Sequence, residues 1–145
     1  MAIDVVHFGR FAPGYKNYSI LDFLARSGIN VHCWLSGDHN DIKNYFKSSA
    51  VNLNIGFYCT NVIKSYNYDL CILPYKSCTQ SGVLIEAIDL GFIPIVPNLD
   101  CFHEFLPPSI FARLYYTNES DLLTNISSID FKSNKQCLEY LRYDH

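Results

Sequence analysis

The segment TQSGVLIEAIDLGFIPIVPN, residues 79–98, decides the fold. Its central part, Val83–Leu90, is apolar at helical spacing, and Gly91 follows it as a common helix terminator. The apolar run that comes next is typical of a strand, and its prolines, Pro94 and Pro97, favour a strand start or a sheet edge over a central position. A helix that ends at glycine and leads directly into a strand is the repeating unit of an α/β protein.

The same alternation extends toward the N-terminus. The sequence predicts strands at 3–9, 30–37, 51–57 and 68–75, separated by helices at 17–28, 39–49 and 60–67. Asn40 or Asp41 is expected to cap the second of these helices. Strands that alternate with short helices in this way favour a parallel sheet with helices on both faces.

The C-terminal part continues the pattern with weaker signals. We expect a helical turn at 101–106, a last strand at 112–117, a helix at 119–129 capped by Asn118 or Ser120, and a terminal helix at 134–145. No linker or repeat divides the chain. The predicted fold is therefore α/β: one Rossmann-like domain over residues 1–145.

Composition limits the function classes. Hydrophobic residues make up 49% and charged residues 17% of the 145, which is typical of a folded protein, and the net charge of −3 gives no reason to expect nucleic-acid binding. No apolar run approaches the roughly 20 residues of a membrane-spanning helix, and no signal peptide is evident, so we expect a soluble, cytoplasmic protein. The six cysteines form no C-x-x-C pair and the five histidines are scattered, which favours reduced structural thiols over a zinc site.

The loop after the first strand, GRFAPGYKN (residues 9–17), is the first candidate site. Gly9 and Gly14 allow a tight turn, while Arg10 and Lys16 bring two cations to the carboxyl end of a strand, where α/β proteins bind ligands. Arginine and lysine both bind phosphate oxygens. The alternative is that both are ordinary surface charges.

The start of the helix in the opening segment is the second candidate site. Gln80, Ser81, Gly82 and Val83 lie where free backbone N–H groups and the helix dipole attract anions. Glu86 lies one turn further along, on the face that holds Gly82, and could bind ligand hydroxyls. The alternative is that Ser81 or the threonine at position 79 only caps the helix.

Several well-known motifs are absent. The chain contains no G-x-G-x-x-G after its first strand, no G-x-x-x-x-G-K-[ST] and no G-x-S-x-G. The sequence therefore gives no support to a dinucleotide oxidoreductase, a P-loop ATPase or an α/β-hydrolase.

Taken together, HFGRFAPGYKNYSILDFL, YDLCILPYKSCTQSGVLIEAIDLGFIPIVPN and FHEFL resemble the C-terminal half of a GT-B glycosyltransferase of the group-1 or family-4 lineage. The resemblance spans Ile3 to Leu106. It implies a site for the nucleotide-diphosphate sugar that such an enzyme uses as donor, with UDP or GDP as the nucleotide and with no cofactor or metal.

The resemblance also assigns roles to the two cations and to the helix start. Arg10 and Lys16 match the catalytic pair that neutralises the donor diphosphate and the leaving group, next to Gly9. Gln80, Ser81, Gly82 and Val83 match the loop and helix start that bind phosphate and sugar hydroxyls.

Three further positions of the donor site follow from the resemblance. Glu86 matches the glutamate that binds the ribose hydroxyls, and Phe57 and Tyr58 lie where the family packs the base. Cys78 stands where the family has another glutamate, and a thiol is a weaker acceptor for sugar hydroxyls. The contacts that bind the donor sugar are therefore expected to differ from those of the family.

The chain is too short for a complete GT-B enzyme, which has two Rossmann-like domains with the active site between them. The resemblance thus implies a donor-binding half whose N-terminal partner domain is absent, and which transfers little sugar alone. The full enzyme is expected to be a retaining hexosyltransferase of bacterial polysaccharide or glycolipid biosynthesis, with peripheral membrane association left open. The alternative is a non-catalytic α/β binding module without a nucleotide-sugar site.

Overall fold

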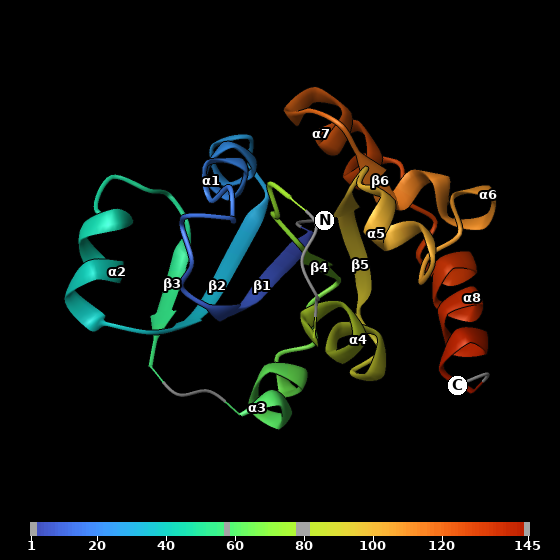
Figure 1. Cartoon of the computed structure of the whole chain (residues 1–145), viewed down its shortest axis with the longest axis horizontal. Coiled ribbons are helices and arrows are strands. Elements are labelled where there is room, and N and C mark those ends of the chain that lie inside the picture. Colours follow the sequence, from blue (N-terminus) through green and yellow to red (C-terminus); the bar gives the residue numbers. More distant parts are fainter. Residues whose placement is uncertain (1–2, 57–58, 78–81, 144–145) are drawn as a thin grey trace.

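A six-stranded parallel sheet forms the centre of the protein (Figure 1). The computed structural model describes residues 3–56, 59–77 and 82–143. The strand order is β3-β2-β1-β4-β5-β6, so the direction of the sheet's growth reverses between β1 and β4. The strands are β1 (Asp4–Arg10), β2 (Asn30–Ser36), β3 (Asn52–Ile55), β4 (Leu70–Ile72), β5 (Ile93–Pro97) and β6 (Tyr115–Tyr116).

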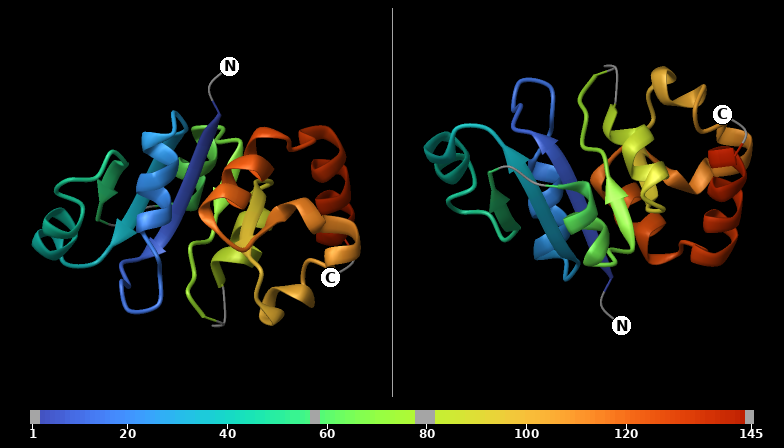
Figure 2. Two further views of the ribbon diagram at one scale, coloured as in Figure 1. Left: turned by 90° about the horizontal axis from the view of Figure 1, so that it is seen from above. Right: turned by 90° about the horizontal axis from the view of Figure 1, so that it is seen from below.

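Helices cover both faces of this sheet, with α1 and α7 on one side and α3 and α4 on the other (Figures 1 and 2). The helices are α1 (Ser19–Arg26), α2 (His39–Tyr45), α3 (Thr60–Ser65), α4 (Gly82–Asp89), α5 (Asp100–His103), α6 (Pro108–Phe111), the 3₁₀ turn η1 (Ala112–Leu114), α7 (Glu119–Ser127) and α8 (Phe131–Tyr143). The α/β, Rossmann-like fold class is confirmed. In the described part of the chain, none of these helices combines the length and apolar character that crossing a bilayer requires.

The core follows the two central strands. Val5, Val6 and Phe8 of β1 are fully buried, as is every residue of β4. Strands covered by helices on both faces are expected to be apolar almost throughout, as these are. One residue breaks this rule, because the histidine at position 7 is also fully buried.

Strand β5 is internal, so its prolines do not lie at a sheet edge, but Pro94 is the second residue of the strand, as the strand-start alternative expects. Its neighbours are β4 and β6. The Ile95 carbonyl accepts a hydrogen bond from Leu73 N, so the backbone of Pro94 faces the other way, toward β6. Strand β6 pairs only with Val96 and Pro97 and does not extend opposite Pro94. The missing N–H therefore costs no ladder hydrogen bond.

Helix α2 is capped by Asp38 rather than by Asn40 or Asp41. The helix starts at His39, and the Asp38 carboxylate accepts a hydrogen bond from Asp41 N at 3.0 Å. Asn40 and Asp41 lie inside the first turn, where the backbone is already helical and a side chain cannot serve as the cap.

The C-terminal part shows two further differences. Asn118 caps α7, as expected, by accepting from Asp121 N at 2.8 Å. The strand expected at 112–117 is reduced to Tyr115–Tyr116, because residues 112–114 form the 3₁₀ turn. Helix α6 was not predicted, although proline in its first turn is a common start signal.

The cysteines are not all reduced. Cys33 and Cys71 are buried free thiols, as expected for small hydrophobic residues, and Cys59 and Cys137 are also free. Cys101, in contrast, is disulfide-bonded. Its expected role as a free thiol is therefore wrong.

Candidate functional site

The loop after β1 is held against the segment after β4. Lys16 and Tyr75 form an isolated antiparallel bridge. Asn17 N donates to the Pro74 carbonyl at 2.6 Å, and Lys76 N donates to the Tyr15 carbonyl at 2.9 Å. Because β1 and β4 are the strands between which the sheet order reverses, these contacts lie at the position where α/β proteins form a ligand crevice.

Lys16 is buried where these two segments meet, with 3% of its surface exposed. Its Nζ donates to the Arg10 carbonyl at 2.8 Å, lies 3.4 Å from His7 Nε2 and sits 5.6 Å from the centre of the Tyr75 ring. Burial lowers the Lys16 pKa to about 8, so the side chain is still mostly protonated at neutral pH. The alternative that Lys16 is an ordinary surface charge is therefore wrong.

His7 is a member of this site that the sequence reasoning missed. Its Nδ1 lies 3.0 Å from the Ile72 carbonyl of β4. A carbonyl oxygen can only accept, so Nδ1 carries the hydrogen and Nε2 is the acceptor that faces Lys16. Burial, and then the charge of Lys16, lowers the His7 pKa to about 3. A histidine within the apolar run IDVVHFG was the signal that could have drawn attention to it.

Gly9 lies next to both candidate regions of the sequence, the loop after β1 and the start of α4. Its φ of +150° disfavours any other residue, and a Cβ atom built on it would lie 3.0 Å from Lys16 Nζ and 3.4 Å from Val83 Cγ2. The ammonium of Lys16 and the first turn of α4 therefore both adjoin the α-carbon of Gly9. The fold brings together two segments that lie about 70 residues apart in the chain.

The first turn of α4 begins at Gly82, directly after residues that lie outside the described part of the chain. Gly82 is exposed, a Cβ built on it would meet nothing within 4 Å, and the first turn contains no acidic residue. These features leave the positive end of the helix dipole uncompensated by the turn itself. The predicted donor residues Cys78, Gln80, Ser81, Phe57 and Tyr58 lie outside the described residues.

Glu86 lies in the next turn of α4 and is half-buried. Partial burial, and then the charge of Asp89, raises the pKa of its carboxyl group. Burial raises the pKa of the Cys71 thiol, Glu86 raises it further and Lys16 lowers it.

Arg10 differs from Lys16. It is exposed, and its Nη2 donates to the Tyr15 hydroxyl at 3.3 Å, a contact that raises the Arg10 pKa. The backbone of Arg10 belongs to the crevice because its carbonyl accepts from Lys16. Its side chain is exposed to solvent, as the surface-charge alternative expects of it.

The charge balance around Lys16 is unusual. None of the ion pairs found among the described residues includes Lys16. An ammonium taken out of water without a carboxylate partner is costly, so such a group attracts an anion strongly. Within the same part of the chain, no three His, Cys, Asp or Glu side chains gather in a way that could hold a metal ion.

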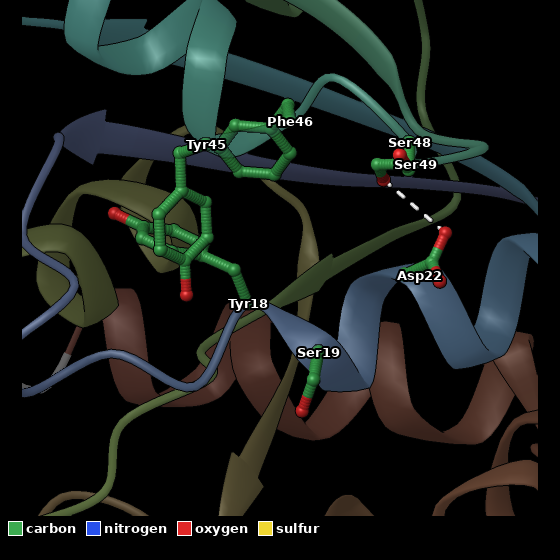
Figure 3. A pocket seen from close by; sticks show the side chains of 7 residues that line it. All are labelled: Tyr18, Ser19, Asp22, Tyr45, Phe46, Ser48 and Ser49. Atoms are coloured by element: carbon green, nitrogen blue, oxygen red, sulfur yellow. Dashed lines mark hydrogen bonds between the residues drawn. The ribbon is translucent and has the colours of Figure 1, made fainter.

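A separate hollow of about 290 Å³ lies between α1 and the end of α2 (Figure 3). The Asp22 carboxylate on its wall accepts from Ser49 Oγ at 3.2 Å, from Ala50 N at 2.8 Å and from Arg26 Nε at 2.8 Å. These bonds hold α1 to the chain after α2 and leave the carboxylate little capacity for a ligand. The residues that line the hollow are Tyr18, Ser19, Asp22, Tyr45, Phe46, Ser48 and Ser49.

Comparisons with known proteins agree with this architecture. No protein-family model matches the chain, and no curated protein matches its sequence. Solved structures do match. The catalytic domain of cholesterol-α-glucosyltransferase from Helicobacter pylori has a TM-score of 0.65 and 21% identity, over 99% of this chain and 94% of that one.

Two larger proteins show the same similarity. The catalytic domain of starch synthase IV from Arabidopsis thaliana has a TM-score of 0.66 and 16% identity, over 97% of this chain and 34% of that one. Sucrose-phosphate synthase from Thermosynechococcus elongatus has a TM-score of 0.71 and 15% identity, over 97% of this chain and 41% of that one. The chain therefore has the fold of a GT-B glycosyltransferase domain, and it spans less than half the length of these two proteins.

Proposed function

We propose that this chain is the donor-binding domain of a glycosyltransferase and binds a nucleotide-diphosphate sugar between the loop after β1 and the start of α4. The observation that carries the proposal is the burial of the Lys16 ammonium beside Gly9 and Val83, with no carboxylate paired to it among the described residues. The GT-B fold supports the same conclusion.

The contacts of Lys16 suit a diphosphate. An ammonium group has three N–H donors, and the two acceptors described here, the Arg10 carbonyl and His7 Nε2, use two of them. The third donor and the full positive charge remain available for a phosphate oxygen. Charge interactions at buried positions are screened less than in water, so this contact would strengthen as negative charge develops on the leaving diphosphate.

Arg10 and the start of α4 would complete the anion site. The exposed guanidinium of Arg10 can turn from Tyr15 toward a ligand and hold two oxygens at once. The N-terminus of α4 at Gly82 would offer backbone N–H groups at the positive end of the helix dipole. Ser81 and Gln80 would extend this surface.

The remaining roles belong to the nucleoside and the sugar. Glu86 would accept hydrogen bonds from the ribose hydroxyls, and Phe57 and Tyr58 would pack against a uracil or guanine base. Cys78 would leave the sugar with one carboxylate contact fewer than the family provides. The starch synthase structure of the same fold is described as bound to ADP and acarbose, which supports a nucleotide site in this kind of domain.

A second Rossmann-like domain would supply the acceptor site. The two larger structures reported above are less than half covered by this chain, which supports a two-domain enzyme. We propose a retaining, metal-independent transfer of a hexose to a glycan or glycolipid in the cytoplasm of a bacterium, with little turnover by this domain alone.

Calorimetric titration of the chain with UDP, GDP and the corresponding nucleotide sugars tests the proposal. We expect saturable binding by at least one of them, and an at least tenfold weaker Kd in Lys16→Met and in Arg10→Ala. Lys43→Met, which removes an exposed lysine on α2, is the matched control and should bind as the wild type does. Absence of binding at millimolar nucleotide, or equal binding by Lys16→Met, would favour the non-catalytic module.

The stability of Lys16→Met makes that result interpretable. Methionine removes a buried charge and keeps most of the side-chain volume, but it leaves the Arg10 carbonyl and His7 Nε2 without their donor. These effects oppose one another, so the melting temperature without ligand should change only modestly. Glu86→Gln should likewise weaken nucleotide-sugar binding without unfolding the domain. A large drop in melting temperature for either variant would assign that residue to the stability of the fold instead of to the ligand.

A further inference from the structure

We infer that His7 is a positioning residue for Lys16: a neutral imidazole, locked in one tautomer by β4, that orients the ammonium without neutralising it. The contact itself is independent of the ligand. Its consequence for nucleotide binding rests on the function proposed above.

The imidazole ring is held from both ends. Nδ1 donates to the Ile72 carbonyl at 3.0 Å and Nε2 faces Lys16 Nζ at 3.4 Å. The ring is fully buried, and its Nδ1 contact crosses from β1 to the neighbouring strand β4. One hydrogen bond to the backbone of a central strand thus determines which nitrogen meets the lysine.

The surrounding sequence makes a histidine unexpected at this position. Its neighbours in β1, Val6 and Phe8, are apolar and fully buried, and an aliphatic or aromatic residue would suit such a position. A buried imidazole costs free energy that only its hydrogen bonds offset. The contact with Lys16 is one of the two that do so.

The groups that face Lys16 explain why a neutral acceptor matters. Arg10 repels the ammonium, and the Tyr75 ring attracts it weakly. Cys33 of β2 and Cys71 of β4 are buried thiols whose pKa values burial raises, so both stay uncharged at neutral pH. Glu86 acts on the same region from α4, but no ion pair joins it to Lys16.

A carboxylate at position 7 would form an ion pair with Lys16 and would compete with a phosphate for it. The neutral imidazole instead directs one N–H of the ammonium inward and leaves its charge uncompensated. Because the imidazole carries no negative charge, His7 orients the ammonium of Lys16 and leaves its full positive charge to attract an anion.

The test uses the chain labelled with ¹⁵N in histidine and lysine. In the wild type, NMR should show His7 with a protonated Nδ1 and a bare Nε2 throughout pH 5 to 8. The opposite tautomer, or titration of His7 within that range, would overturn the inference without any ligand being involved.

His7→Leu and His7→Gln then separate positioning from packing. Leucine removes the acceptor, so the pKa of the Lys16 ammonium should fall below that of the wild type and UDP should bind about three- to tenfold more weakly at pH 8. Glutamine supplies an amide oxygen and should restore both values. If leucine unfolds the domain, His7→Phe fills the same position and gives the same comparison.

If the Lys16 pKa is unchanged in His7→Leu, or if glutamine does not restore the lowered Lys16 pKa and UDP affinity, His7 is a packing residue. If no form of the chain binds UDP, the proposed function fails, while the titration of Lys16 still decides whether His7 positions it.

Discussion

Acid should destabilise this protein in part through His7, and a substitution at that one position should remove this contribution. His7 is fully buried and its pKa falls from 6.5 to about 3 on folding. Between these two values the unfolded chain binds a proton at His7 that the folded chain does not. The stability is therefore fully present above pH 6.5 and is lost as the pH falls toward 3.

The magnitude follows from proton linkage. Each pH unit within that window costs about 1.4 kcal/mol for one such group. Between pH 7 and pH 4.5 the loss from His7 alone is about 2.5 kcal/mol. This is a large share of the roughly 5 to 15 kcal/mol by which domains are usually stable.

Urea denaturation of the wild type and of His7→Gln at pH 7 and pH 4.5 measures the effect. Glutamine does not titrate, so its loss of stability over this range should be about 2.5 kcal/mol smaller than that of the wild type. The other histidines, such as His32, His39 and His103, are present in both proteins and cancel in the difference. Equal losses in the two proteins would show that His7 titrates freely and that its burial and tautomer are misassigned.

Three further outcomes are expected. Gly9→Ala should lower the free energy of unfolding, measured by thermal denaturation, by about 1 to 3 kcal/mol, because φ at this position is +150° and the new Cβ would press on Lys16 Nζ. Gly14→Ala is the control: its Cβ would meet nothing within 4 Å, so it should cost less than half as much. Asp38→Ala should lower the urea-derived stability by about 1 kcal/mol through loss of the α2 cap, and no such loss is expected for Asn40→Ala. UDP affinity, measured by calorimetry, should decline as the pH rises through about 8, because Lys16 loses its proton there. A decline that begins only near the ordinary lysine pKa would contradict the burial of Lys16.

Much of the architecture was predictable because its signals are local. Apolar β-branched runs, helical periodicity and glycine at the ends of elements each arise within about ten residues of chain. The first strand, the helix over Val83–Leu90 and the capping role of Asn118 are all found where these signals place them. The candidate cations were visible for a similar reason, because residues that follow a strand in an α/β pattern lie at the edge where ligands bind.

Some of the errors are local, such as the cap of α2 and the 3₁₀ turn at residues 112–114, but others involve partners that lie far apart in the chain. The internal position of β5 depends on which strands pair beside Pro94, and the role of His7 depends on a carbonyl 65 residues away. A cysteine beside an apolar run reads as a free thiol whether or not another sulfur lies near it, which is why the disulfide of Cys101 was missed.

The amino-acid sequence by itself determined the order of strands and helices and the kinds of side chain that stand at their ends, because backbone propensity and hydrophobic periodicity act over short distances. Only the tertiary structure decided that Lys16 is buried, that Gly9 lies against both its ammonium and Val83, and that a neutral histidine is the side chain beside it. Whether a side chain is buried, and which charges lie near it, depends on how the strands and helices pack against one another. That packing forms only once strands distant in the chain have paired.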